Sequence, residues 1–208
     1  MYKLFIFDMD GTLVDSVDKW ADLFERTLLK YHINVPREHL KGSFGREAPE
    51  IIRMLIPNGM AREATNFFMN HQKDYLSTFQ AFPSAKRVFK DAKEKGHIVA
   101  VATGNTRRLM NFFLQKFELA QYVDFCICSE DVAHGKPDPE ILLKTLKHFN
   151  IRPEDAFYIA DSPMDFLAAK AAHIKIGLIT TGVLCEKRAR DLKPDYVFRD
   201  LIEVEKLI

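Results

Sequence analysis

Residues 4–12 read LFIFDMDGT, an apolar run that ends in two aspartates and a glycine. Four consecutive apolar residues bounded by Asp8 and then Gly11 are typical of a strand buried on both faces, as in a parallel sheet. In open sheets of this kind, ligands bind outside the carboxyl ends of the strands. The stretch therefore predicts a core strand and places its first candidate functional groups, Asp8 and Asp10, at the end of that strand.

From residue 83 onward, short apolar runs alternate with helical patterns. The runs predict strands at 98–102, 125–128, 156–160, 174–179 and 196–198. Helical spacing between them predicts helices at 85–95, 109–117, 139–149, 162–172 and 186–192. Alternation of this kind implies right-handed crossovers and a parallel sheet with helices on both faces. The predicted fold class is therefore α/β, with a Rossmann-like core.

The segment between the first and second predicted strands has a different pattern. Its apolar residues recur at helical spacing over 17–31, 47–55 and 61–79, a short helix could open at Pro36, and no strand signal occurs from 16 to 80. We therefore predict an all-helical insert at residues 16–81. The α/β core would consist of residues 1–15 and 82–208, joined to the insert by linkers near 14–16 and 81–84.

Composition and charge exclude several classes of protein. The chain has 208 residues, of which 47% are hydrophobic and 28% charged, as in ordinary globular proteins. Lys and Arg number 30 against 29 Asp and Glu, so the net charge of +1 provides no electrostatic reason to expect nucleic acid or an anionic membrane as a partner. No apolar run approaches the roughly 20 residues of a membrane-spanning helix.

The three cysteines are too few for a disulfide framework. Cys126 and Cys128 are spaced to share one face of a strand, and Cys185 stands alone. Half a metal site is the alternative interpretation, but it lacks a second Cys or His pair at ligand spacing. Reduced, buried thiols in a reducing compartment are favoured, and we expect a cytoplasmic protein.

Polar residues follow the other predicted strands, where they would meet Asp8 and Asp10 at the same edge of the sheet. These are Thr103 in VATGN, Lys136 in HGKPDPE, and Asp161 and Asp165 in ADSPMD. Clustered carboxylates repel one another unless a cation or a proton intervenes, and the hard oxygens of aspartate suit Mg²⁺ better than Zn²⁺. The lysine and threonine would then face an anion that shares the metal, and a phosphoryl group fits that description.

Residues 7–16, FDMDGTLVDS, resemble the first motif of the haloacid dehalogenase superfamily, in its phosphatase branch. Thr103, Lys136 and the Asp161–Asp165 pair match the second, third and fourth motifs of that family in order. The helical insert resembles the family's cap domain, so the resemblance covers essentially the whole chain. It implies a hydrolase similar to phosphoglycolate phosphatases.

The resemblance also implies roles for the aspartates. Asp8 would be the nucleophile that forms an aspartyl-phosphate. Asp10 would protonate the leaving oxygen and then activate the water that hydrolyses the intermediate. Mg²⁺ would be held by Asp8, by the backbone carbonyl of Asp10 and by Asp161.

The same resemblance implies how the phosphoryl group would be held. Thr103 and the backbone amide of Gly104 would bind its oxygens. Lys136 would neutralise charge and orient the nucleophile, and Asp165 would support Lys136 or the metal-bound waters without touching the substrate.

Arg46, in the insert's GSFGR loop at 42–46, is a candidate substrate contact, because family members often place a cation of the cap over the substrate. The alternative is a solvated arginine at the start of the next helix. A cation opposes the helix dipole at that position, so helix stability does not by itself favour it there.

The expected function is a Mg²⁺-dependent phosphatase acting on a small phosphorylated metabolite, as a monomer or small homo-oligomer. A phosphomutase of the β-phosphoglucomutase type, an inorganic pyrophosphatase and a nucleotide 5′-phosphatase are alternatives within the same superfamily. A non-catalytic module that binds a phosphate ligand is the alternative from another class. Dehalogenation is disfavoured, because dehalogenases of this superfamily lack the second aspartate, which is present here as Asp10.

Overall fold

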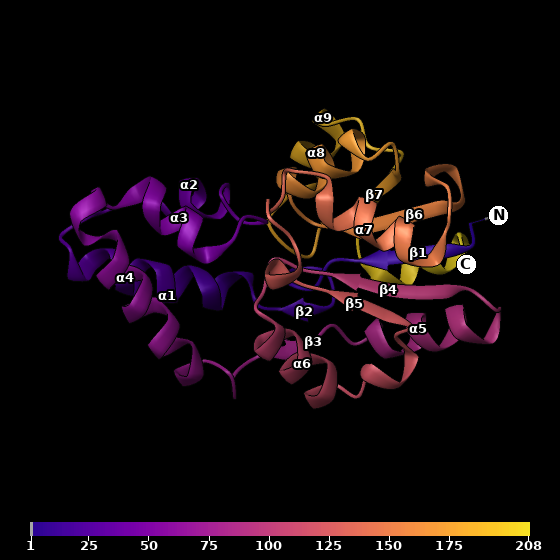
Figure 1. The fold of residues 1–208 in the computed structure, drawn as a ribbon, viewed down its shortest axis with the longest axis horizontal. Helices are drawn as coiled ribbons and strands as arrows, with labels where there is room; N and C mark the ends of the chain where they lie inside the picture. Colours follow the sequence, from indigo (N-terminus) through magenta and orange to yellow (C-terminus); the bar gives the residue numbers. More distant parts are fainter. Residues whose placement is uncertain (1) are drawn as a thin grey trace.

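Six parallel strands form the central sheet of the computed structural model, which describes residues 2–208 (Figure 1). Their order is β5-β4-β1-β6-β7-β8. The strands are β1 (Leu4–Phe7), β4 (Ile98–Ala102), β5 (Phe125–Ile127), β6 (Ala156–Ala160), β7 (Lys175–Ile179) and β8 (Tyr196–Phe198). Strand β1 pairs with β4 on one side and β6 on the other, so its carboxyl end lies at the middle of the sheet edge. The α/β fold class predicted from the sequence is confirmed.

Helices cover both faces of the sheet, because successive side chains of a strand point to opposite faces. In β1, Phe5 and Phe7 belong to one hydrophobic cluster, and Leu4 and Ile6 belong to the other. The first cluster includes residues of α5 (Ala85–Glu94) and α6 (Arg107–Lys116), and the second includes residues of α7 (Glu140–Phe149), α8 (Pro163–Ala171) and α9 (Glu186–Asp191). All four residues of β1 are fully buried, which explains its unbroken apolar sequence.

The insert contributes four helices, which lie together beside the carboxyl ends of the strands (Figure 1). They are α1 (Val17–Lys30), α2 (Arg37–Lys41), α3 (Ala48–Leu55) and α4 (Asn58–His71). Two short strands, β2 (Val14–Asp15) and β3 (Gln80–Ala81), pair antiparallel where the chain leaves and re-enters the core. We keep the boundaries 16–81 for the cap, and 1–15 with 82–208 for the core, as a proposal.

Two expectations for the insert are wrong in detail. Strand β3 begins at Gln80, where no strand was expected, and the helix expected over 61–79 ends at His71. Beyond it the chain turns back toward the core, where Lys116 Nζ donates to the carbonyl oxygens of Leu76 at 2.7 Å and Phe79 at 2.9 Å. Apolar spacing continued past the end of the helix because Phe79 is buried there by tertiary contacts, not by a helical face.

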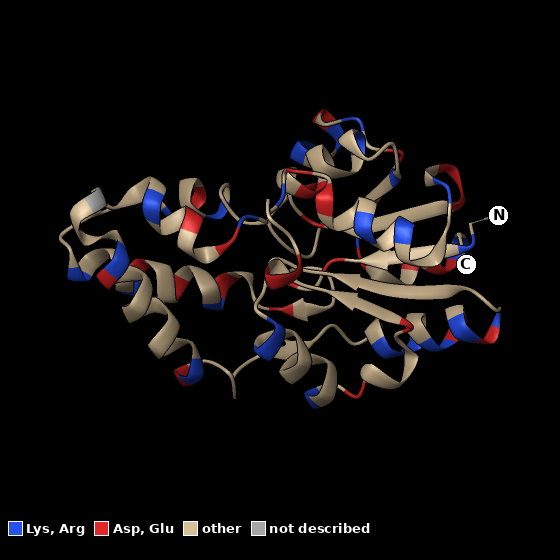
Figure 2. Ribbon diagram, in the orientation of Figure 1, with Lys and Arg blue, Asp and Glu red and all other residues tan. Residues whose placement is uncertain are grey.

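Charge and hydropathy agree with the sequence analysis. In the view of Figure 2, basic and acidic residues are interspersed along the helices of both parts of the molecule. Within residues 2–208, no helix combines the length and apolar composition needed to cross a bilayer. All three cysteines are free thiols, and Cys185 is exposed instead of buried, because it lies just before α9 in a loop.

Candidate active site

Asp8 follows β1 directly and forms a buried ion pair with Lys136. The Nζ atom of Lys136 lies 2.7 Å from Asp8 Oδ1 and 2.6 Å from Asp165 Oδ1. The three side chains are at most 7% exposed. Charges this deeply buried require partners, so Asp8 and Asp165 stabilise the ammonium group between them.

Asp165 is held in place by the first turn of α8. Ser162 is the N-cap of that helix, and its hydroxyl oxygen accepts a hydrogen bond from the Asp165 backbone amide while donating to the Asp165 carboxylate. The hydroxyl of Tyr158, on β6, donates to Asp165 Oδ1 at 2.6 Å. A carboxylate is also favoured at a helix N-terminus by the helix dipole. Asp165 is therefore a fixed partner for the Lys136 ammonium group.

Asp161 follows β6 and lies tightly against two glycines. Its Oδ2 atom accepts a hydrogen bond from the backbone amide of Val183 at 2.8 Å. A Cβ atom on Gly182 would lie 1.9 Å from that oxygen, and one on Gly11, whose φ is +72°, would lie 2.2 Å from it. Only glycine at both positions leaves room for Asp161 in this place.

The carboxylates of Asp8, Asp161 and Asp165 form one buried group, with an oxygen of each within 4.8 Å of the others. Burial raises the pKa of Asp8 to about 7, although Lys136 opposes the shift. Burial, and then the charges of Asp8 and Asp165, raise the pKa of Asp161 well above its usual value. Burial disfavours the charge on Lys136, but Asp165 and Asp8 outweigh it and raise the pKa of the ammonium group.

This donor set fits a hard divalent cation. Its atoms are all oxygens, and burial, with a smaller contribution from the neighbouring carboxylates, raises the pKa values of Asp8 and Asp161, so a cation would favour their charged forms. Asp165 is already bonded to Lys136, Tyr158 and Ser162, which leaves Asp8 and Asp161 as the carboxylates open to a metal. Mg²⁺ matches this chemistry, and Zn²⁺, which prefers nitrogen and sulfur, matches it less well.

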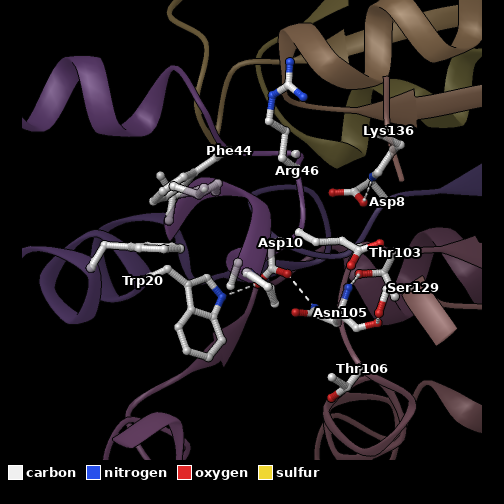
Figure 3. A pocket seen from close by; sticks show the side chains of 18 of the residues that line it. Asp8, Asp10, Trp20, Phe44, Arg46, Thr103, Asn105, Thr106, Ser129 and Lys136 are labelled. Carbon is white, nitrogen blue, oxygen red and sulfur yellow. Dashed lines mark hydrogen bonds and ion pairs between the residues drawn. The ribbon is translucent and has the colours of Figure 1, made fainter. Parts of the chain in front are cut away.

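These residues lie in a cavity of about 140 Å³ between the sheet edge and the insert (Figure 3). Except for Asp165, all the site residues expected from the sequence line it: Asp8, Asp10, Arg46, Thr103, Gly104, Lys136 and Asp161. Thr103 follows β4, is 1% exposed, and accepts a hydrogen bond at its Oγ1 from the Asn105 backbone amide at 3.2 Å. The wall on the insert side is largely apolar and includes Trp20, Phe24, Phe44, Phe68 and Met69.

Arg46 lines the cavity but is already paired. Its guanidinium forms an ion pair with Glu50 one turn along, and in Figure 3 it extends away from Asp10. The preceding Gly45 has a φ of +95°, and a Cβ atom there would lie 2.3 Å from Ser162 Oγ. The loop at 42–46 therefore packs against the start of α8, next to Asp161. Contact between Arg46 and a substrate stays a prediction.

Three residues of the site were missed by sequence reasoning. Trp20 and Asn105 both donate to the carboxylate of Asp10, and Tyr158 donates to Asp165. Asn105 could have been found, because it ends the VATGN stretch that follows β4. Trp20 and Tyr158 fall within the apolar patterns of a predicted helix and strand, which do not reveal that a buried indole or phenol needs a hydrogen-bond partner.

The fold and the site together define an α/β enzyme with a buried aspartate–lysine centre at the carboxyl ends of its strands. The chain belongs to the haloacid dehalogenase-like hydrolases, whose family model matches residues 5–179. The resemblance drawn from the four sequence motifs is thereby confirmed.

Relatives and solved structures agree with this assignment. Phosphoglycolate phosphatase 1 of Pseudomonas aeruginosa is 30% identical over 86% of this chain and 70% of its own length. Validoxylamine A 7'-phosphate phosphatase of Streptomyces hygroscopicus is 30% identical over 98% of this chain and 96% of its own. The crystal structure of a hydrolase from Pseudomonas syringae, 20% identical, superposes with a TM-score of 0.90 over 99% of this chain and 97% of that one, which shows the shared fold.

The crowded carboxylates predict an unusual pH dependence of stability for the metal-free protein. The folded state raises the pKa of Asp8 from 3.8 to about 7, so it binds this proton more tightly than the unfolded chain does. Stability should therefore fall as the pH rises between those values, where the charged carboxylate must be buried. We expect the Tm of Asp8→Asn, relative to wild type, to increase from about pH 5 to about pH 7.5.

Thermal melts of both proteins in chelator would check this, since the difference between them cancels most other titrating groups. Added Mg²⁺ should stabilise the wild type and should stabilise Asp161→Asn less. A difference in Tm that does not change with pH would show that folding does not raise the pKa of Asp8.

Proposed function

We propose that this chain is a Mg²⁺-dependent phosphatase that hydrolyses a small phosphate monoester through a phosphoryl group carried on Asp8. The main support is the geometry of Asp8, which is buried, lines the cavity and is bound at Oδ1 by Lys136. Within residues 2–208, its Oδ2 accepts no hydrogen bond, so this oxygen is free to attack phosphorus. Covalent catalysis by a carboxylate requires a fixed and accessible oxygen of this kind.

Asp8, Asp161 and the backbone carbonyl of Asp10 would hold the Mg²⁺ ion. When bound, the ion supplies positive charge that offsets the carboxylates and the phosphoryl oxygens. Lys136 supplies a second, fixed positive charge, 2.7 Å from Asp8 Oδ1. Membership of the family and the buried oxygen donors support this assignment.

The remaining groups divide between binding and proton transfer. Thr103 and the Gly104 amide would donate to the phosphoryl oxygens from the end of β4. Asp10 would give a proton to the leaving oxygen while the Asp8–phosphorus bond forms. It would then take a proton from the water that breaks that bond. The position of all these groups around one cavity supports the division.

The cavity favours a compact ester. Its volume of about 140 Å³ is below the roughly 300–1,000 Å³ of sites for drug-sized ligands. A small phosphorylated metabolite therefore fits the site better than a nucleotide. The name of the Pseudomonas aeruginosa relative makes phosphoglycolate the first substrate to test. The free thiols of the three cysteines support a reducing, cytoplasmic setting, and a monomer or small homo-oligomer remains our expectation.

A phosphate-release screen with Mg²⁺ over a panel of phosphorylated metabolites tests the proposal. The panel should include phosphoglycolate, pyrophosphate, a nucleoside monophosphate and β-glucose 1-phosphate, and each assay should be repeated with Asp8→Asn. Release that depends on Asp8 supports the phosphatase. Conversion of β-glucose 1-phosphate into its isomer with little free phosphate would favour the mutase. Binding of esters without turnover would favour the non-catalytic module.

Arg46→Ala is expected to lower kcat/KM for the preferred substrate and to affect p-nitrophenyl phosphate much less. Beyond its phosphate, the aryl ester offers no second anionic group for a cation to bind, so the loss should be largely confined to the natural substrate. Steady-state kinetics of both esters would check this, with the exposed Arg62→Ala as the matched control. Equal losses on both esters would assign Arg46 to the catalytic centre or to the fold. No loss on either would make it a surface arginine paired with Glu50.

A further inference from the structure

The carboxylate of Asp10 is held from two sides. Its Oδ1 accepts a hydrogen bond from Trp20 Nε1 at 2.6 Å, and its Oδ2 accepts one from Asn105 Nδ2 at 2.5 Å (Figure 3). Trp20 lies on α1 in the insert, and Asn105 lies in the loop after β4 in the core. One carboxylate thus receives a donor from each part of the molecule.

Both donors are themselves fixed. The indole of Trp20 is 7% exposed, and its ring centroid lies 4.6 Å from that of Phe79. The backbone amide of Asn105 donates to Thr103 Oγ1, and its carbonyl oxygen accepts from Ser129 Oγ at 3.0 Å. Rotating the Asp10 carboxylate would therefore break two hydrogen bonds whose donors cannot follow it.

We propose that Trp20 and Asn105 are positioning residues that set the orientation of Asp10 for proton transfer. This inference rests on the proposed function. In the first step, an Asp8 oxygen bonds to phosphorus, the bond from phosphorus to the leaving oxygen breaks, and a proton passes from Asp10 to that oxygen. In the second step, water bonds to phosphorus, the Asp8–phosphorus bond breaks, and Asp10 takes the water proton. Each Asp10 oxygen accepts one N–H, which leaves the other lone pair of that oxygen for these transfers.

Trp20 also makes the acid–base group depend on the insert. The indole leaves Asp10 if α1 moves away from the sheet edge, and the carboxylate then loses one of its two fixed bonds. Proton transfer is therefore correctly arranged only when the insert lies over the cavity, as it does here. A residue that merely fills the core would not give this dependence.

The choice of ester separates positioning of an acid from general support of the site. An alkyl phosphate needs a proton on its leaving oxygen, whereas p-nitrophenolate departs without one. The value of kcat/KM includes only the steps up to the first irreversible one. It therefore reports binding of the ester and formation of the phosphoryl enzyme, and not the later hydrolysis of that enzyme. We expect Trp20→Phe to lower kcat/KM for the alkyl ester about 10- to 100-fold, part of the 10²–10⁴ that an acid contributes, and to change it little for p-nitrophenyl phosphate.

Further variants complete the kinetic test. Asn105→Ala should reproduce the selective loss, and combining it with Trp20→Phe should approach but not exceed the loss of Asp10→Asn. Phe67→Leu, an aromatic change on α4 outside the cavity, is the matched control and should leave both esters unaffected. Equal losses on both esters in Trp20→Phe would overturn the proposal, and so would the absence of any loss.

A second measurement does not depend on activity. Trp20 is the only tryptophan of the chain, so ¹⁵N-labelled protein gives a single indole N–H signal. A hydrogen bond to Asp10 should move this signal downfield and slow its exchange with water. Asp10→Ala should move it upfield, whereas Asp15→Ala, a change of an exposed aspartate nearby, should not. An indole signal insensitive to Asp10 would contradict the contact. A sensitive signal in a protein with no Asp8-dependent turnover would instead contradict the proposed function.

Discussion

Replacing Asp8 with asparagine is expected to lower phosphate release by several orders of magnitude. The amide keeps the shape of the side chain but removes the charge that attacks phosphorus, so the phosphoryl enzyme cannot form. Binding of the ester should survive better than turnover, because Thr103, Gly104 and Lys136 remain. Single-turnover and steady-state measurements on the preferred ester would check this.

The variant should remain folded, because Lys136 keeps its ion pair with Asp165 and one of the crowded carboxylates loses its charge. Asp15→Asn, at an exposed position in β2, is the matched control and should retain full activity. If Asp8→Asn kept most of its activity, catalysis through a phosphoryl group on Asp8 would be wrong.

Removal of Mg²⁺ is the second change with a large expected effect. Without a divalent ion, Asp8 and Asp161 are two buried acids facing the negative charge of the incoming phosphate. Activity should therefore vanish in chelator and return when Mg²⁺ is added. Activity titrated against free Mg²⁺ would measure the dependence, and Asp161→Asn should shift the curve to higher concentrations and lower its plateau.

The exposed Asp15→Asn should leave the Mg²⁺ titration unchanged, since this side chain lies outside the carboxylate group. Full activity in protein freed of divalent ions would show that Lys136 alone neutralises the charge of the phosphoryl group, and that catalysis needs no metal.

The parts of the fold that could be predicted are those encoded in continuous patterns. The five strands that join β1 in the central sheet were expected within one residue of their observed ends, because strands buried on both faces are unbroken apolar runs. The pairing of β2 with β3 could not be predicted, since strands of two residues carry no periodicity. The end of α4 was missed because Lys116, 45 positions after His71, binds the chain that follows it.

The site divides in the same way. Asp8, Thr103 and Asp161 could be predicted because parallel strands bring the polar residues at their ends to one edge. Lys136, which lies in a loop beyond β5, could be predicted from its match to the third family motif. The hydrogen bond from Trp20 to Asp10 depends on how α1 packs over the sheet, and helical spacing says only that one face of α1 is buried. The pairing of Arg46 with Glu50 was open to prediction as an i, i+4 pair on a helix start.

The most direct measurement is detection of a phosphoryl group on Asp8. Asp10→Asn should slow the hydrolysis of the phosphoryl enzyme but not its formation from p-nitrophenyl phosphate, whose leaving group needs no proton. Asp10→Asn protein that is mixed with this ester and Mg²⁺ and then quenched in acid should therefore carry one added phosphoryl group. Mass spectrometry of its peptides should place this group on Asp8, and Asp8→Asn should show none. Measurable turnover of the ester with no phosphorylated Asp8, in wild-type and in Asp10→Asn protein alike, would contradict the proposed mechanism.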